Sequence, residues 1–414
     1  MQHPSPRIGV LFLDPTHHPD AIREAGGEPV PLRLPRAAPR WGVALAREWV
    51  ADAAQISGSH ERLDALIVAA EEPATLAGLV LASLRLNLPT VVNPPRDAGL
   101  FAAVAALGLA PVAASPAEAA VEVTGPAGPR PLALIEGFSL ANALRAALSS
   151  GEGPEMMVHL SAIAREAGAT GFEQMLRVLV PETLPLVEPG SPWLKKHGVA
   201  GLLSYLGDEL HDTRTVEGAL REVLPPVPPP PPPAPESRLI FVRGRASGTE
   251  ALCPVLGSET EILGQCRVHH SEKFAARVVE GGFVEPGSLL VVGGCGPRGG
   301  PGLSRLDRLA QALRESGLDE SVSVMTDGLP PRGGTRGKWV SLVSPEAAAG
   351  GVIGRLLTGD SLRIDLLEGR IRTGVKAGEL EDRNPYEPSG STGAGYAARY
   401  ARSALPALEG AGFG

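Results

Sequence analysis

The stretch VEPGSLLVV at residues 284–292, followed by GPRGGPGL at residues 296–303, decides the architecture of the second half of this 414-residue chain. A Glu-Pro-Gly turn leads into a short run of aliphatic side chains, which is typical of a buried strand. The glycine-rich segment after it marks a tight loop. The stretch therefore predicts a turn, a buried strand and a sharp loop in close succession.

Similar strand patterns recur before and after this stretch. Turn residues separate them, and helical patterns at residues 306–316 and 345–357 interrupt them. This alternation favours a compact β-barrel or sandwich with a few covering helices. The strand patterns lie at residues 239–242, 288–292, 321–325, 339–342 and 362–366.

The first half has a different pattern, in which short apolar runs alternate with helical periodicity. The runs at residues 7–13 and 66–69 are bounded by polar or proline residues and are typical of buried parallel strands. Strands that alternate with helices predict a layered α/β domain with a mostly parallel sheet. The helical patterns lie at residues 44–55, 74–86, 98–107, 141–148 and 157–167.

A proline-rich run divides the two halves. Residues 225–236 read PPVPPPPPPAPE, and such a run forms an extended spacer of limited flexibility. It could also dock an SH3-like groove, but a spacer between two folded parts is the simpler interpretation. We therefore expect an N-terminal domain over residues 1–224, a linker over residues 225–236, and a C-terminal domain with a helical tail over residues 237–414.

Composition excludes several function classes. The net charge of −8 is spread along the chain without a basic, aromatic-rich stripe, so we expect no nucleic-acid partner. No run approaches eighteen apolar residues and no signal-peptide pattern is evident, so we expect a cytoplasmic protein without a membrane partner. Cys253, Cys266 and Cys295 are widely spaced, which favours neither disulfides nor a cysteine-ligated metal site.

Several motifs in one order resemble the dihydroxyacid and 6-phosphogluconate dehydratase family. Residues 284–303 resemble its glycine-loop motif, and the resemblance extends into both halves of the chain. It implies an N-terminal α/β domain and a C-terminal swivelling β-barrel domain, usually in a dimer, with the active site between the domains. The other matching motifs are EAGG (24–27), ASLRLNLP (82–89), HLSAIAREAG (159–168), TDG (326–328), GGT (333–335), VSPEA (343–347), GDSLRID (359–365) and GYAARYA (395–401).

Dehydration of a 2,3-dihydroxy acid needs a base for the C2 proton, a Lewis acid on the leaving hydroxyl, and stabilisation of the enolate. In the family, a serine, an iron–sulfur cluster and a magnesium ion supply these functions. The cluster requires thiolates, and the resemblance places its three cysteines in the N-terminal half. This chain has no cysteine before Cys253.

The positions that resemble the family's ligands carry other residues. Thr16 and Glu72 stand at two of the cysteine positions, and residues 91–96 around the third contain no sulfur. Pro73 and Ala74 stand for the magnesium-binding aspartate and modified lysine. Arg305 falls near the position of a glutamate ligand, and no hydroxyl lies in the LPPR segment that replaces the serine. We therefore expect neither an iron–sulfur cluster nor magnesium.

We interpret the chain as a degenerate, shortened member of this family, with trimmed cluster loops and a remnant site between its domains. Glycines in two loops are candidates for anion binding through their N–H groups, although the same glycines also suit turns that need positive φ. A small carboxylate or sugar acid is the expected ligand. The candidate remnant residues are Thr16, Glu71, Glu72, Arg305, Asp327, Arg332 and Thr335, and the loop glycines are Gly299, Gly300, Gly302, Gly333 and Gly334.

The leading functional hypothesis is a non-catalytic binding or subunit-type protein that forms a homodimer or pairs with an active relative. A second hypothesis is a hydro-lyase with a rebuilt or metal-free site. A rebuilt metal site would draw on Glu71, Glu72, His17, His18 and His159, although such residues at loops and strand ends are ordinarily solvated. A third hypothesis is a ligand-responsive regulator that uses the cleft between the domains.

Overall fold

The apolar run Ala65–Ala69 forms β3 inside a parallel sheet, and each of its side chains is buried. The computed structural model describes residues 5–12, 19–93, 99–232, 237–244, 248–257, 259–300, 302–332, 338–388 and 394–414. The strand order in this sheet is β2-β1-β3-β4. Helices cover both faces, which explains why the strands are continuously apolar. The other strands are β1 (Arg7–Phe12), β2 (Glu28–Leu32) and β4 (Thr90–Val92).

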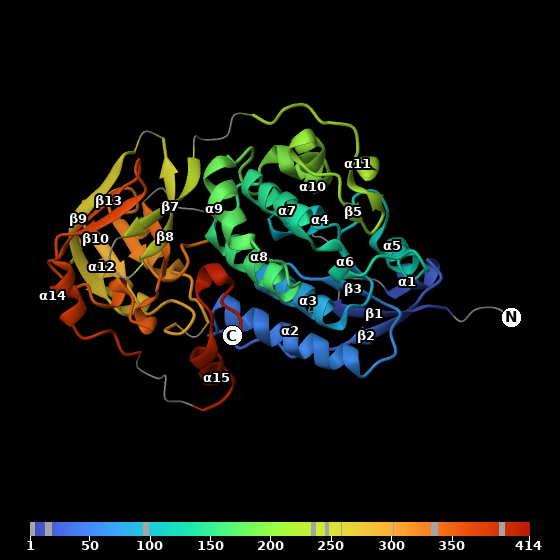
Figure 1. Ribbon diagram of the computed structural model, residues 1–414, viewed down its shortest axis with the longest axis horizontal. Coiled ribbons are helices and arrows are strands. Elements are labelled where there is room, and N and C mark those ends of the chain that lie inside the picture. The colour runs from blue at the N-terminus through green and yellow to red at the C-terminus, as the bar shows by residue number, and fades with distance from the viewer. Residues whose placement is uncertain are drawn as a thin grey trace.

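The strand order fixes where the helices lie. The chain passes from β1 to β2 on one side and then crosses to β3 on the other side of β1. Right-handed crossovers therefore place α1 (Pro19–Glu24) on one face, and α2 (Val43–Ser59) and α3 (Pro73–Leu86) on the other. A further helical layer packs beside them (Figure 1). It contains α4 (Leu100–Ala106), α5 (Pro116–Glu122), α6 (Pro131–Leu134), α7 (Gly137–Ser149), α8 (Pro154–Glu166), α9 (Phe172–Glu182), α10 (Pro192–Leu206), η1 (Gly207–Glu209), the short hairpin β5 (Arg214–Thr215) and β6 (Gly218–Ala219), and α11 (Leu220–Val223).

The proline-rich linker is fastened to the N-terminal part over its first residues. The indole Nε1 of Trp193 donates to the Pro229 carbonyl at 2.9 Å, and Ser204 Oγ donates to the Pro225 carbonyl at 2.8 Å. Both donors belong to α10, along which the chain runs before it reaches the second domain (Figure 1). Proline carbonyls accept hydrogen bonds although proline lacks the N–H donor, so the extended segment is held without secondary structure.

The C-terminal part is a closed barrel with the strand order β10-β11-β12-β8-β7-β14-β13-β9. The barrel contains both parallel and antiparallel pairs, and the strands β9, β10, β11 and β12 pair in parallel. The helices α12 and α13 pack against each other on its outside. The strands are β7 (Ser237–Gly244), β8 (Glu250–Leu256), β9 (Glu261–His269), β10 (Leu289–Val292), β11 (Ser323–Thr326), β12 (Trp339–Ser344), β13 (Ser361–Asp365) and β14 (Arg370–Thr373), with α12 (Glu272–Glu280), α13 (Asp307–Glu315) and α14 (Ala377–Asp382).

The predicted fold class, a layered α/β domain followed by a β-barrel, is confirmed. The helix expected over residues 345–357 is wrong. That segment forms two 3₁₀ turns, η3 (Ala347–Ala349) and η4 (Val352–Gly354). Gly350 separates them with a φ of +77°, a conformation that favours glycine and ends a helix.

The last segment of the chain returns to the N-terminal domain (Figure 1). The ring of Tyr396, in α15 (Tyr396–Ser403), stacks on Trp41 at a centroid distance of 5.7 Å, and its hydroxyl donates to Asp52 of α2 at 2.7 Å. The turn η5 (Ala407–Glu409) then packs against α8 and β12. The chain therefore ends between the two domains. No helix among the described residues is both long and apolar enough to cross a membrane.

Candidate functional site

A glycine loop of the barrel domain accepts hydrogen bonds from the first turn of helix α2. The carbonyl of Gly302 accepts from Ala44 N at 2.9 Å, and the carbonyl of Leu303 accepts from Val43 N at 3.0 Å. These N–H groups begin a helix and have no partner within it. Gly302 has a φ of +90°, and a Cβ there would overlap Leu45. The glycine is therefore required for this close approach between the domains.

Arg305, three residues further on, forms a nearly buried ion pair across the domain boundary. Its Nη2 lies 2.5 Å from Glu155 Oε2, and the two side chains are only 10% and 13% exposed. The other carboxylate oxygen of Glu155 lies 3.5 Å from Nε2 of His159, which is fully buried one turn later in α8. Burial would raise the pKa of Glu155, but contact with His159 and Arg305 lowers that pKa to about 2. Glu155 is therefore an anion across the physiological pH range.

A second carboxylate, Glu152, lies beside this pair, just before α8 begins. A Cβ on Gly99 would lie 2.6 Å from its Oε1, so the glycine makes room for the carboxylate. Burial raises the pKa of Glu152 to about 7, and the charge of Glu155 adds to that shift, whereas Arg332 and Arg305 oppose it. The site thus holds one permanent carboxylate and one that titrates near neutral pH.

Arg332 reaches α3 from the barrel domain. Its Nη2 lies 3.3 Å from Glu72 Oε1, and both side chains are about half exposed. The other oxygen of Glu72 accepts from Thr75 N at 2.7 Å and caps α3. Arg332 and Glu72 therefore already have partners within the protein. Because water screens exposed pairs, this contact adds little stability.

Asp327 follows β11 and is buried. It accepts from the N–H groups of Gly294 at 3.0 Å, Cys295 at 2.8 Å and Ala347 at 2.9 Å. Burial raises its pKa above the ordinary value of an aspartate. With three backbone donors, Asp327 joins the loop after β10 to η3 rather than facing the domain boundary.

The N–H groups of the first glycine loop have acceptors within the protein. Gly299 donates to Glu346 Oε2 at 3.1 Å, Gly300 to the Gly296 carbonyl at 2.9 Å, and Gly302 to the Pro297 carbonyl at 3.2 Å. Burial, followed by the charge of Asp327, raises the pKa of Glu346 to about 7. An external anion at this loop would have to displace these acceptors, one of which is the protein's own carboxylate.

A buried cation of the N-terminal domain, Arg47, lies beside His159, the residue that contacts Glu155. Arg47 of α2 is fully buried and lies 2.9 Å from Glu48 Oε1. It also donates to the Gly410 carbonyl at 2.5 Å and lies 3.4 Å from Nδ1 of His159. Arg47 thereby connects the end of the chain to the imidazole that holds Glu155. The expectation that His159 is solvated is wrong, because α8 places it in the core.

The donor set does not fit an iron–sulfur cluster. Cys253, Cys266 and Cys295 are all buried in the barrel domain. Burial raises the pKa of Cys253 and of Cys266 to about 12 and that of Cys295 well above its ordinary value. Cluster irons need thiolates, which these environments disfavour. Within the part of the chain that the structure describes, no three His, Cys, Asp or Glu side chains are grouped to hold a metal ion.

The structure brings together some of the residues that the sequence nominated. Glu72 meets Arg332, and Arg305 lies nearby, whereas Glu71 is exposed and Asp327 faces inward. Sequence reasoning missed Glu152 and Glu155, although both precede the HLSAIAREAG motif, and it did not nominate Glu346 within VSPEA. Thr16, His17, His18, Gly333, Gly334 and Thr335 lie outside the described residues.

Comparisons with known proteins give matches over most of the chain. Residues 231–411 match the family described as "Dihydroxy-acid/6-phosphogluconate dehydratase C-terminal". The "Dihydroxy-acid dehydratase" of Synechococcus sp. (strain RCC307) is 33% identical over 326 residues, which cover 72% of this chain and 58% of the relative. The protein of the same name from Citrifermentans bemidjiense is 31% identical, over 68% of this chain and 55% of the relative. "Dihydroxy-acid dehydratase 2" of Bordetella bronchiseptica is 32% identical, over 69% and 54%. The chain thus spans somewhat more than half the length of these curated relatives.

Proposed function

Because this chain belongs to the dihydroxy-acid/6-phosphogluconate dehydratase family, we propose that it is a non-catalytic member that acts as a binding or subunit-type protein. The observation that carries this proposal is the nearly buried ion pair of Arg305 with Glu155, whose other carboxylate oxygen lies beside His159. The resemblance places Arg305 near the position of a metal-binding glutamate. A fixed positive charge there opposes a divalent cation in the same space.

The chemistry of an arginine supports the proposal. A guanidinium stays protonated in proteins and has no lone pair to offer, so Arg305 can neither ligate a metal nor accept the C2 proton. It can stabilise an anion. Its partner Glu155, with a pKa lowered to about 2, is a weak base that cannot take up that proton at neutral pH.

The sulfur chemistry points in the same direction. The chain has no cysteine before Cys253, and the three cysteines that it has are buried in the barrel. Without a thiolate-held cluster, the departing hydroxyl lacks the Lewis acid that the family uses. No step of the family's reaction is therefore assigned to this site.

A binding role draws on the positive charges at the domain boundary. Arg332 is half exposed, and Glu152 beside it is half protonated near neutral pH. A small carboxylate or a sugar acid that pairs with Arg332 would replace Glu72 as its partner. As a subunit-type protein the chain would form a homodimer or pair with an active relative. Sedimentation of the chain alone and mixed with such a relative tests that part.

One observation favours a second candidate function, a hydro-lyase with a metal-free site. The pKa of Glu152 is raised to about 7, which suits a general acid–base at neutral pH. In that case Glu152 would move protons in the absence of any metal. The variant Glu152→Gln keeps the size of the side chain and removes the titration.

The test is turnover. Protein purified without oxygen, and a portion supplied with iron, sulfide and magnesium, is assayed for keto-acid formation from 2,3-dihydroxyisovalerate and from a panel of aldonic acids. A curated relative treated in the same way serves as the positive control. We expect no conversion above the blank in either portion. Conversion after iron loading would refute the proposal, and metal-free conversion that Glu152→Gln abolishes would establish the second candidate.

A further inference from the structure

We propose that a pocket between α7 and α9, outside the domain boundary, binds a small monocarboxylate that carries a hydrocarbon chain. The pocket has a volume of about 410 Å³, within the range of small-molecule sites. Its walls are apolar, with Phe138 from α7 and Met175, Val178 and Leu179 from α9, and two nitrogen-bearing side chains, Arg145 and His211, complete it. This inference does not depend on the function proposed above.

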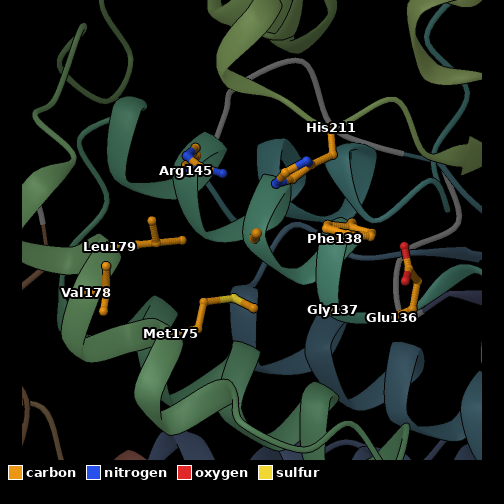
Figure 2. Close-up of a pocket in the computed structure, with 9 residues that line it drawn as sticks. Glu136, Gly137, Phe138, Arg145, Met175, Val178, Leu179 and His211 are labelled. Atoms are coloured by element: carbon orange, nitrogen blue, oxygen red, sulfur yellow. The ribbon is translucent and has the colours of Figure 1, made fainter.

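Two large residues of the apolar wall are exposed. Phe138 and Val178 are 57% and 53% exposed, although both are large apolar residues that gain from burial. Figure 2 shows Val178, Leu179 and Met175 along α9, facing the helix that carries Phe138 and Arg145. A hydrocarbon chain lying between the two helices would cover this wall. Neighbouring exposed apolar residues of this kind often mark a binding site.

Arg145 supplies the argument for an anionic head group. Its Nη1 atom is buried, and among the described residues it has no hydrogen-bond partner. The three nearly buried arginines Arg47, Arg85 and Arg305 all pair with carboxylates. A buried donor of a charged group is costly when it is left unpaired. A carboxylate would satisfy Arg145 in the geometry that guanidinium groups favour.

The two ends of the pocket differ in charge. Glu136 lies at the opposite end of the lining from Arg145 (Figure 2), and its backbone N–H donates to Ser139 Oγ at 2.9 Å. The two positions are nine residues apart along α7 and its N-cap, a rise of about 13 Å. A ligand with its head at Arg145 therefore extends toward Phe138 and away from the negative charge.

The rim of the pocket is held in place. The ring of His211 lies 4.6 Å from that of Phe138, and the backbone of His211 exchanges two hydrogen bonds with the Asn142 side chain, each at 2.8 Å. The ligand would therefore enter a pre-formed site. Binding to a pre-formed site avoids the entropic cost of ordering a loop.

The test is titration calorimetry with sodium octanoate, together with butanoate, hexanoate and uncharged 1-octanol. With the native protein we expect affinity to rise by up to about fourfold for each added methylene, because the chain buries apolar area. We expect 1-octanol to bind at least about tenfold more weakly than octanoate, because it lacks the charge that Arg145 needs. These comparisons need no variant.

The variants Arg145→Gln and Arg165→Gln locate the head group. Arg165 is exposed on α8 outside the pocket and serves as the matched control. We expect Arg145→Gln to weaken octanoate binding about tenfold or more and Arg165→Gln to leave it unchanged. The proposal is overturned if no carboxylate binds, if Arg145→Gln binds as tightly as the native protein, or if 1-octanol equals octanoate. It is also overturned if sedimentation shows a dimer that Phe138→Ser dissociates while octanoate fails to bind.

Discussion

Replacing Arg305 with methionine is predicted to destabilise the protein by about 3 kcal/mol at pH 8. Arg305 and Glu155 are 10% and 13% exposed, so removing the cation leaves a carboxylate that water reaches poorly. Loss of one partner of a buried pair costs about 3–5 kcal/mol, and we take the lower end because His159 still contacts the other oxygen. Methionine keeps most of the volume, which limits any cavity.

The assay is equilibrium urea unfolding followed by tryptophan fluorescence. The matched control is Arg308→Met, because Arg308 pairs with Glu280 but both side chains are 45% exposed. Exposed pairs contribute less than about 1 kcal/mol, so the control is expected to unfold almost as the native protein does. The double variant with Glu155→Gln removes the unpaired charge and should recover part of the loss.

The pH dependence of stability provides a second test of the Arg305→Met variant. In the native protein the pKa of Glu155 is lowered to about 2, so its favourable contribution is present above about pH 4.5 and is lost as the pH falls toward 2. Without Arg305, burial dominates and raises this pKa. The deficit of Arg305→Met should therefore shrink as the pH falls from 8 to 5 and the carboxyl takes up a proton. A loss at pH 8 no larger than that of Arg308→Met would refute the reasoning.

Three further predictions follow from other contacts. Gly302→Ala should destabilise the protein by about 2–4 kcal/mol in urea unfolding, because it adds a clash with Leu45 to the strain of positive φ. Gly317→Ala, also at positive φ but with no neighbour within 4 Å, should cost only the strain, about 1–2 kcal/mol, and equal losses would contradict the docking role of Gly302. Glu152→Gln should be as stable as the native protein at pH 4.5 and more stable by up to about 3 kcal/mol at pH 8. The reason is that the pKa of Glu152 is raised to about 7 in the folded protein, so its deprotonation between pH 4.5 and 8 destabilises the native protein. A stability difference that does not change with pH would show that Glu152 titrates normally. The three cysteines should react with a chromogenic thiol reagent only after unfolding, because they are buried as thiols of raised pKa; rapid reaction of the folded protein would contradict this.

Several strands that the sequence predicted are continuous apolar runs, whereas the predicted strand at residues 362–366 alternates apolar and charged residues. Residues 66–69 and 289–292 bury both faces, so composition alone marks them. Among the barrel strands, β8, β9 and β14 escaped prediction, because Pro254 interrupts β8, Gly264 and Gln265 interrupt β9, and β14 has only four residues. These strands are specified by closure of the barrel, which sequence periodicity does not reveal.

The candidate site was predicted in part for a similar reason. The resemblance nominated Arg305, Arg332 and Glu72 from motifs, and the structure places all three at the domain boundary. The glutamates at 152 and 155 stand in a GEGPE segment that resembles a solvated turn. Only the packing of α8 against the barrel loops, about 150 residues away in sequence, buries them beside arginine.

The measurement that tests the central claim most directly is the iron and acid-labile sulfide content of protein purified without oxygen from iron-supplied cells. The absence of sulfur donors from the N-terminal half predicts a colourless protein with far less than stoichiometric iron and sulfide, both before and after reconstitution. Stoichiometric iron accompanied by sulfide and visible absorption would contradict it.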